Sequence, residues 1–205
     1  YLVPSVGVEN VVAAYEDPKL DEDGFTLTEN TGNDDHPALN GVSLSVPAGG
    51  SLGIAGATGS GKTTTLYGIL QSFDHSIKNI MSIEDPIENI IPNISQMEVN
   101  NKAEITFAAL LRNALRQNPD VICLGEIRDS ETAEIAAQAA QTGHFIVATL
   151  HSNDNIGTLD RMMSLGVQMR TLASTLRMIV SQRLVRKLCS CKQRVALPEE
   201  YREYF

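Results

Sequence analysis

From about residue 51 onward, short apolar runs alternate with longer segments whose apolar residues recur at helical spacing. Five of the short runs predict β-strands, at residues 51–55, 79–84, 94–99, 120–124 and 144–150. Two of them, "DVICL" and "HFIVATL", are apolar without alternation, which is typical of a parallel strand buried on both faces. The pattern therefore predicts a sheet with a buried centre.

The segments between these runs predict helices. Asp129 or Ser130 is placed to cap the one that ends at Gln141. The predicted helices cover residues 62–73, 103–117, 130–141, 156–165 and 169–187. Strands separated by helices imply an α/β fold in which a mainly parallel sheet is flanked by helices through right-handed crossovers.

The first 50 residues differ from the rest in charge. They hold nine acidic residues and only Lys19 as a base, which places −8 of the net charge of −9 in this segment. Residues 16–37 are polar, acidic and rich in turn formers, so we expect a linker or long loop there. Because the remainder is nearly neutral, the charge gives no support to general nucleic-acid binding, and we expect no nucleic-acid partner.

The cysteines and the chain start bear on the setting of the protein. Cys123, Cys189 and Cys191 make no disulfide framework and fit a reducing compartment. Glycine, proline, serine, glutamine and histidine interrupt the longest uncharged stretches, so none reads as a membrane span. The chain begins with Tyr1 rather than Met, and we expect it to be part of a longer protein.

The stretch "GATGSGKTTT", residues 56–65, lies between a predicted strand and a predicted helix. Its glycines, closed by Lys62 and Thr63, form the phosphate-binding pattern of nucleoside triphosphatases, in which the lysine reaches the β- and γ-phosphates and the threonine offers its hydroxyl to Mg²⁺. Glycine lets backbone N–H groups approach the phosphates, and the helix N-terminus adds favourable partial charge. We therefore predict ATP and Mg²⁺ as ligands, with the nucleotide held by Gly56, Thr58, Gly59, Ser60, Gly61, Lys62, Thr63 and Thr64.

The loop alone leaves several classes of nucleotide-binding protein open. The lead-in "LNGVSLSVPAGGSLGIAGATGSGKTT" resembles the start of an ABC transporter nucleotide domain. An LSGGQ-like signature is missing, however, and "VICLGEIRD" lacks the Asp-Glu ending expected of that class. An ABC-type subunit is therefore the alternative hypothesis, followed by a nucleotide-dependent scaffold without turnover.

From Gly56 to Cys191 the chain closely resembles the secretion-ATPase family that drives type II secretion and type IV pilus assembly. The resemblance rests on five stretches in order: "GATGSGKTTTLY", "SIEDPIE", "FAALLRNALRQNPDVICLGEIRDSETAEIAAQAAQTGH", "ATLHSND" and "SQRLVRKLCSCK". The family implies a RecA-like P-loop ATPase core in a homohexamer. It also implies a cytoplasmic location at the bacterial inner membrane, where hydrolysis rotates a platform protein. Pilus assembly and secretion both stay open.

The resemblance also implies roles for acidic residues. "SIEDPIE" matches the family's aspartate box, which makes Glu84 the candidate general base for the attacking water, with Asp85 and Glu88 as supporting acids. "GEIRD" matches the second nucleotide-binding motif, where Glu126 is expected to hold Mg²⁺ or its water. The usual aspartate is absent there, so a carboxylate one methylene longer takes that role.

Histidines and arginines complete the predicted site. "TGHFIVATLHSND" matches the family's histidine box; His144 and His151 flank a strand and cannot both lie near one phosphate. We expect His151 to sense the γ-phosphate and His144 to be positional. In a ring ATPase, an arginine from the neighbouring subunit commonly stabilises the charge that develops on the γ-phosphate. The candidates for this role are Arg112, with Arg116 on the same helical face, and Arg128. Intrachain ion pairs are the alternative for these arginines.

The matched stretches suggest three parts. Residues 1–50 are expected to be the remnant of a preceding domain, residues 51–188 the ATPase core, and residues 189–205 a tail or truncated subdomain. Members of this family often bind zinc through two CxxC pairs, whereas this tail offers only Cys189 and Cys191. A structural zinc site takes four ligands, so we do not expect one within these residues. Cys123, inside an apolar strand, is expected to serve packing.

Overall fold

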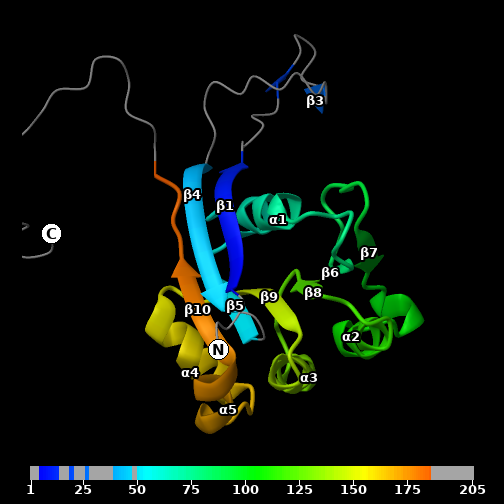
Figure 1. The fold of residues 1–205 in the computed structure, drawn as a ribbon, viewed down its shortest axis with the longest axis vertical. Helices are drawn as coiled ribbons and strands as arrows, with labels where there is room; N and C mark the ends of the chain where they lie inside the picture. Colours follow the sequence, from blue (N-terminus) through cyan, green and yellow to red (C-terminus); the bar gives the residue numbers. More distant parts are fainter. Residues whose placement is uncertain (1–4, 14–18, 21–25, 28–38, 48–49, 186–205) are drawn as a thin grey trace, which may run out of the picture.

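A six-stranded parallel sheet forms the centre of the molecule (Figure 1). The structure is a computed structural model, which describes residues 5–13, 19–20, 26–27, 39–47 and 50–185. The strand order is β10-β5-β9-β8-β6-β7, and every neighbouring pair is parallel. The strands are β5 (Gly50–Ala55), β6 (Ile80–Glu84), β7 (Ser95–Glu98), β8 (Val121–Leu124), β9 (Phe145–Leu150) and β10 (Leu176–Ser181). The parallel α/β fold and all five predicted strands are confirmed.

Helices cover both faces of this sheet. The helical elements are α1 (Lys62–Ser72), the short 3-10 turn η1 (Asn101–Ala103), α2 (Phe107–Leu115), α3 (Ser130–Gln141), α4 (Asn155–Ser164) and α5 (Met169–Thr175). Figure 1 shows α1 on one side of the sheet and α2 to α5 on the other.

Alternation along β8 shows how the two layers are filled. Val121 and Cys123 pack with the apolar residues of α1, whereas Ile122 and Leu124 pack with those of α2 and α3. Successive side chains of a strand point to opposite faces, so a strand covered on both sides must be apolar throughout. This explains the unbroken apolar pattern of "VICL", and it confirms the packing role expected for Cys123.

The N-terminal part adds two antiparallel pairs. One consists of β1 (Ser5–Ala13) and β4 (Leu39–Pro47), the other of β2 (Lys19–Leu20) and β3 (Thr26–Leu27). Strand β1 lies beside α1 (Figure 1). Most of the predicted linker at 16–37, and the whole tail with Cys189 and Cys191, lie outside the described residues.

Two helix predictions are corrected. The predicted helix 169–187 ends at Thr175, and Leu176–Ser181 is instead a strand that pairs in parallel with β5. The free edge of β5 offers a row of backbone hydrogen-bonding groups, and pairing with them outweighs the modest helix preference of this segment. The predicted helix 103–117 begins only at Phe107, because the hydroxyl of Thr106 caps the backbone N–H of Ala109.

The helix over 130–141 is confirmed, with Asp129 as its cap. Helices α1 and α4 begin and end within about one residue of their predicted bounds. No helix within the described ranges has the length and apolar character needed to cross a membrane.

Candidate active site

The phosphate loop joins the end of β5 to the start of α1, and its shape depends on glycine. Gly59 and Gly61 have φ angles of 76° and 82°, in the left-handed region that side chains disfavour. At Gly56 an added Cβ atom would lie 2.8 Å from the carbonyl oxygen of Gln182. Larger residues at these three positions would therefore strain the loop or displace its neighbours.

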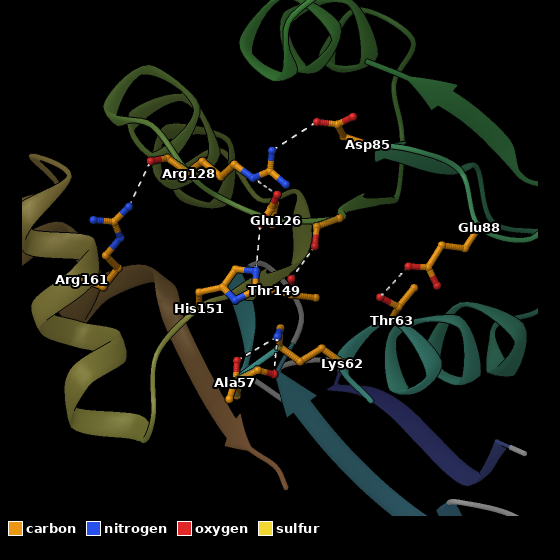
Figure 2. A network of polar contacts seen from close by, with 12 residues as sticks. Ala57, Lys62, Thr63, Asp85, Glu88, Glu126, Arg128, Thr149, His151 and Arg161 are labelled. Carbon is orange, nitrogen blue, oxygen red and sulfur yellow. Dashed lines mark hydrogen bonds and ion pairs between the residues drawn. The ribbon is translucent and has the colours of Figure 1, made fainter. Parts of the chain in front are cut away.

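Lys62, the first residue of α1, folds back over the loop. Its ammonium group donates hydrogen bonds to the carbonyl oxygens of Gly56, at 2.8 Å, and Ala57, at 3.0 Å (Figure 2). Burial lowers the pKa of Lys62 from its usual value. Among the described residues only carbonyl oxygens hold this ammonium group, which is therefore well placed to exchange these contacts for an anion.

The loop also keeps unused donors. The hydroxyl of Ser60 is buried and has no hydrogen-bond partner within the described part of the chain. Gly61, which precedes α1, provides no side chain to cap the first turn of the helix. The first N–H groups of a helix lack internal partners and attract anions. These unused donors suit the loop to a phosphate group.

A pocket of about 350 Å³ opens at this loop. It is lined by six of the predicted nucleotide-binding residues, namely Thr58, Gly59, Gly61, Lys62, Thr63 and Thr64. Gly56 and Ser60 do not line it: the carbonyl of Gly56 binds Lys62, and the backbone N–H of Ser60 donates to the carbonyl of Ala57 at 3.2 Å.

Three of the predicted catalytic residues reach the same pocket from three neighbouring strands. Glu84 ends β6, Glu126 follows β8 by two residues, and His151 comes directly after β9. The carboxyl ends of parallel strands meet at one edge of the sheet, which is where ligands bind in open α/β folds. The pocket is further lined by Asp85, Glu88, Arg128 and Thr149.

Glu126 stands at the centre of a polar cluster (Figure 2). Its carboxylate is paired with the guanidinium of Arg128 through one oxygen and with His151 Nε2 through the other, at 3.1 Å. Arg128 also reaches Asp85, with 3.3 Å between Nη1 and Oδ2, and its carbonyl accepts a hydrogen bond from Arg161. Glu126 of the second nucleotide-binding motif is thus connected to both the aspartate box and the histidine box.

The two histidines are separated as expected. Burial, together with the positive charges of Lys62 and Arg128, lowers the pKa of His151, whose Nε2 atom lies 3.1 Å from a carboxylate oxygen of Glu126. His144, at the other end of β9, contacts Thr142 and the carbonyl of Ala139 instead. His144 therefore has a local structural role, and His151 alone of the two lines the pocket.

Thr63 faces a carboxylate across the pocket. Its hydroxyl lies 3.5 Å from Glu88 Oε1, a contact visible at the right of Figure 2. The pocket is lined by the Thr63–Glu88 pair on one side and by Glu126 on the other. Hydroxyl and carboxylate oxygens therefore face the pocket from two sides. Hard cations such as Mg²⁺ take oxygen ligands of this kind.

Arg112 does not line the pocket. It lies on α2, where its guanidinium pairs with Glu131 at 2.7 Å, and about half of its side chain is exposed. Arg116 contacts Asn113 on its own helix. The intrachain alternative thus holds for the contacts of Arg112 within one subunit, and an action on a neighbouring subunit stays a prediction.

Two residues at the site were not assigned from the sequence. Tyr67, on α1, donates its hydroxyl hydrogen to Glu84. It belongs to the stretch "GATGSGKTTTLY", four residues after Thr63, but the sequence pattern alone assigns it no role. Gln182 contacts the phosphate loop from the end of β10. Residue 182 falls within the predicted helix 169–187, and that pattern does not place it at the loop.

The chain was compared with protein families and with curated proteins. Residues 30–204 match the family described as type II/IV secretion system protein. The chain belongs to that family. It is 52% identical over 137 residues to the type II secretion system protein HxcR of Pseudomonas aeruginosa, which covers 67% of this chain and 29% of that protein. It is 48% identical over 151 residues to the type IV pilus assembly ATPase PilB of Acinetobacter baylyi, covering 73% and 26%.

Solved structures of two other proteins, a pilus motor and an ATPase, share the fold. The pilus retraction motor PilT with bound ADP matches with a TM-score of 0.62 and 38% identity, over 70% of this chain and 45% of that one. The Legionella pneumophila ATPase DotB matches with a TM-score of 0.59 and 33% identity, over 68% and 42%. The RecA-like core expected from the sequence is confirmed by these neighbours.

Membership of the secretion family favours the leading hypothesis over an ABC-type subunit. The chain nevertheless spans less than a third of the length of the curated relatives it matches. What those proteins do as wholes therefore enters below as a proposal.

Proposed function

We propose that this chain is the nucleotide-hydrolysing part of a motor ATPase that powers type II protein secretion or type IV pilus assembly. The observation that carries the proposal is the pocket in which the phosphate loop meets Glu84, Glu126 and His151 at the carboxyl edge of the sheet. The similarity to PilT, whose structure holds ADP, supports a nucleotide in this position.

The phosphate loop would bind the triphosphate. Lys62 would exchange the carbonyl oxygens of Gly56 and Ala57 for oxygens of the β- and γ-phosphates. The first turn of α1, which carries no side-chain cap among the described residues, supplies further donors. Binding of this kind positions the γ-phosphate in front of the acidic residues that follow β6 and β8.

Glu84 is the proposed general base. A carboxylate within reach of the attacking water orients it and accepts its proton as the bond to the γ-phosphate breaks. Glu84 is only 3% exposed yet lines the pocket, so its carboxylate faces the site from a protected position. Arg128 and His151 lie beside Glu126, where positive charge and a donor would stabilise the charge on the phosphate oxygens.

Thr63 and Glu126 would hold Mg²⁺. The oxygen ligands around the pocket fit this ion, which usually completes its shell with phosphate oxygens and water. When bound, Mg²⁺ neutralises charge on the β- and γ-phosphates. For Glu126 to serve as a ligand, its carboxylate must share its lone pairs with Arg128 and His151.

We further propose that six copies form a ring that acts at the cytoplasmic face of a bacterial inner membrane on a platform protein. This part of the proposal rests on the family and on curated relatives in secretion and pilus systems. In such a ring an arginine of one subunit completes the site of the next, for which Arg112, half exposed and outside the pocket of its own subunit, is a candidate.

The test measures MgATP binding and hydrolysis together. Lys62→Ala should remove binding and turnover while the fold stays intact, because it deletes the fixed positive side chain of the loop. Lys78→Ala, at the exposed pair with Asp120, is the matched control and should change neither. Binding without turnover at every protein concentration would favour the scaffold hypothesis, and equal affinity of Lys62→Ala and wild type would contradict the nucleotide site.

A further inference from the structure

A hydrogen-bond network surrounds Glu84 on the buried side of the pocket. Its Oε1 atom accepts hydrogen bonds from the Ser82 hydroxyl, at 2.5 Å, and from Gln96 Nε2, at 3.0 Å, while Oε2 accepts one from the Tyr67 hydroxyl. A carboxylate that is 97% buried would be costly without such partners. Each carboxylate oxygen has two lone pairs, so Oε1 is fully used and Oε2 keeps one for a water molecule.

Tyr67 and Gln96 also form hydrogen bonds with the backbone of segment 88–91. The Tyr67 hydroxyl also accepts hydrogen bonds from the backbone N–H groups of Glu88, at 3.1 Å, and Asn89, at 3.2 Å. Gln96 donates to the carbonyl of Asn89, at 2.9 Å, and accepts from the N–H of Ile91, at 2.7 Å. The same two side chains therefore fix both the carboxylate of Glu84 and the backbone of segment 88–91, which brings Glu88 to the pocket.

The direction of the Tyr67 hydrogen bonds follows from its partners. Backbone N–H groups only donate, so the tyrosine oxygen accepts from Glu88 and Asn89 and its single proton must go to Glu84. Burial and the hydrogen bond to Glu84 raise the pKa of Tyr67 to about 12, so the hydroxyl keeps its proton at neutral pH.

Tyr67 also belongs to the helix that starts at the phosphate loop. Helix α1 begins at Lys62, and Tyr67 lies in its second turn with its ring packed in the core beside Leu66 and Leu70. A rigid helix thus connects the lysine that meets the phosphates with the hydroxyl that meets Glu84.

We propose that Tyr67 is a positioning residue for hydrolysis, which holds Glu84 and segment 88–91 in register with the phosphate-binding end of α1. Gln96 supports the same arrangement from β7. The inference rests on the proposed function, because it assigns Tyr67 a task through the proposed general base. This role differs from packing in the core, because it depends on the hydroxyl of Tyr67 and not on its ring.

The first experiment does not depend on turnover. Tyr67→Phe keeps the ring in the core and removes only the hydroxyl, so backbone hydrogen exchange of segment 88–91 should become roughly fivefold faster or more, as expected for the loss of a hydrogen bond. Ser72→Ala removes another hydroxyl from the same helix, one that bonds to Ile69, and should leave exchange in this segment unchanged. Unchanged exchange in Tyr67→Phe overturns the proposal.

The second experiment tests whether the effect runs through Glu84. Tyr67→Phe should lower kcat about tenfold or more while the KM for ATP stays within about twofold, because positioning of the base and not nucleotide binding is lost. In a Glu84→Gln background the same change should cost less than about twofold. Equal costs in both backgrounds overturn the proposal. A wild-type protein without turnover would contradict the proposed function, and hydrogen exchange would then decide the role of Tyr67.

Discussion

Gln182 joins the phosphate loop to the edge strand β10 by donating its side-chain amide to the carbonyl oxygen of Ser60, at 2.6 Å. The same side chain accepts the hydroxyl hydrogen of Thr65 at 2.7 Å, and its backbone N–H bonds to the carbonyl of Ala55. One residue therefore fixes the end of β5, the phosphate loop and the first turn of α1 relative to one another.

Gln182→Ala should weaken MgATP binding roughly tenfold. Loss of two side-chain hydrogen bonds, each contributing about 1 kcal/mol, loosens the loop whose backbone must meet the phosphates. Gln182→Glu should weaken binding further, because a carboxylate cannot donate to the Ser60 carbonyl. Nucleotide titration checks both variants, with Gln138→Ala on the exposed face of α3 as the control. Wild-type affinity in Gln182→Glu would show that the contact does not matter for binding.

The two pocket glutamates should differ in their effects. Glu84→Gln should leave MgATP binding nearly normal and lower turnover by roughly a hundredfold or more, the usual scale of general-base loss. Glu126→Gln should impair turnover and Mg²⁺ dependence together, because the proposed metal ligand loses its charge. Affinity and hydrolysis rate are measured at several Mg²⁺ concentrations, with the exposed Glu134→Gln on α3 as the control. Normal hydrolysis in either pocket variant contradicts the role given to that residue.

Assembly should be visible in the hydrolysis rate. If each site is completed by a neighbouring subunit, activity per subunit rises with protein concentration, and Arg112→Ala reduces that rise while nucleotide binding persists. The exposed pair between Arg112 and Glu131 contributes at most about 1 kcal/mol to stability, so the variant should remain folded. Glu131→Ala breaks the same pair but keeps the arginine and should retain activity. A rate per subunit that is flat from dilute to concentrated protein argues against a shared site.

Two glycines near the site should respond oppositely to alanine. At Gly53, beside an apolar cavity of about 30 Å³, an added Cβ would meet its nearest neighbours at 3.8 Å, an ordinary contact. Gly53→Ala should therefore raise the free energy of unfolding by about 0.4–1 kcal/mol, since it restricts the unfolded chain. At Gly125 the same atom would lie 3.2 Å from the carbonyl oxygen of Ile83 and 3.3 Å from Glu84 Cα, so Gly125→Ala should destabilise the protein. Urea unfolding measures the free energy of unfolding of both variants. A lower free energy of unfolding in Gly53→Ala would show that the added methyl group does not fit the space beside β5.

Much of the core was determined by the sequence alone. The unbroken apolar run "VICL" predicts a strand covered on both faces, and Asp129 or Ser130 predicts the start of α3. Both predictions hold because they depend on the residue types of a short segment. The glycines and Lys62 predict the phosphate loop, because the backbone conformation that glycine permits and one fixed charge determine what the loop can bind.

The tertiary structure decided the rest. Leu176–Ser181 has no strong local preference, and the free edge of β5 made it a strand and brought Gln182 to the loop. Likewise, the hydrogen bond from Tyr67 to Glu84 and the contact between His151 and Glu126 join residues from separate elements of the chain. Local propensity contains no information on such contacts, because they arise only when parallel strands align their carboxyl ends at one edge of the sheet.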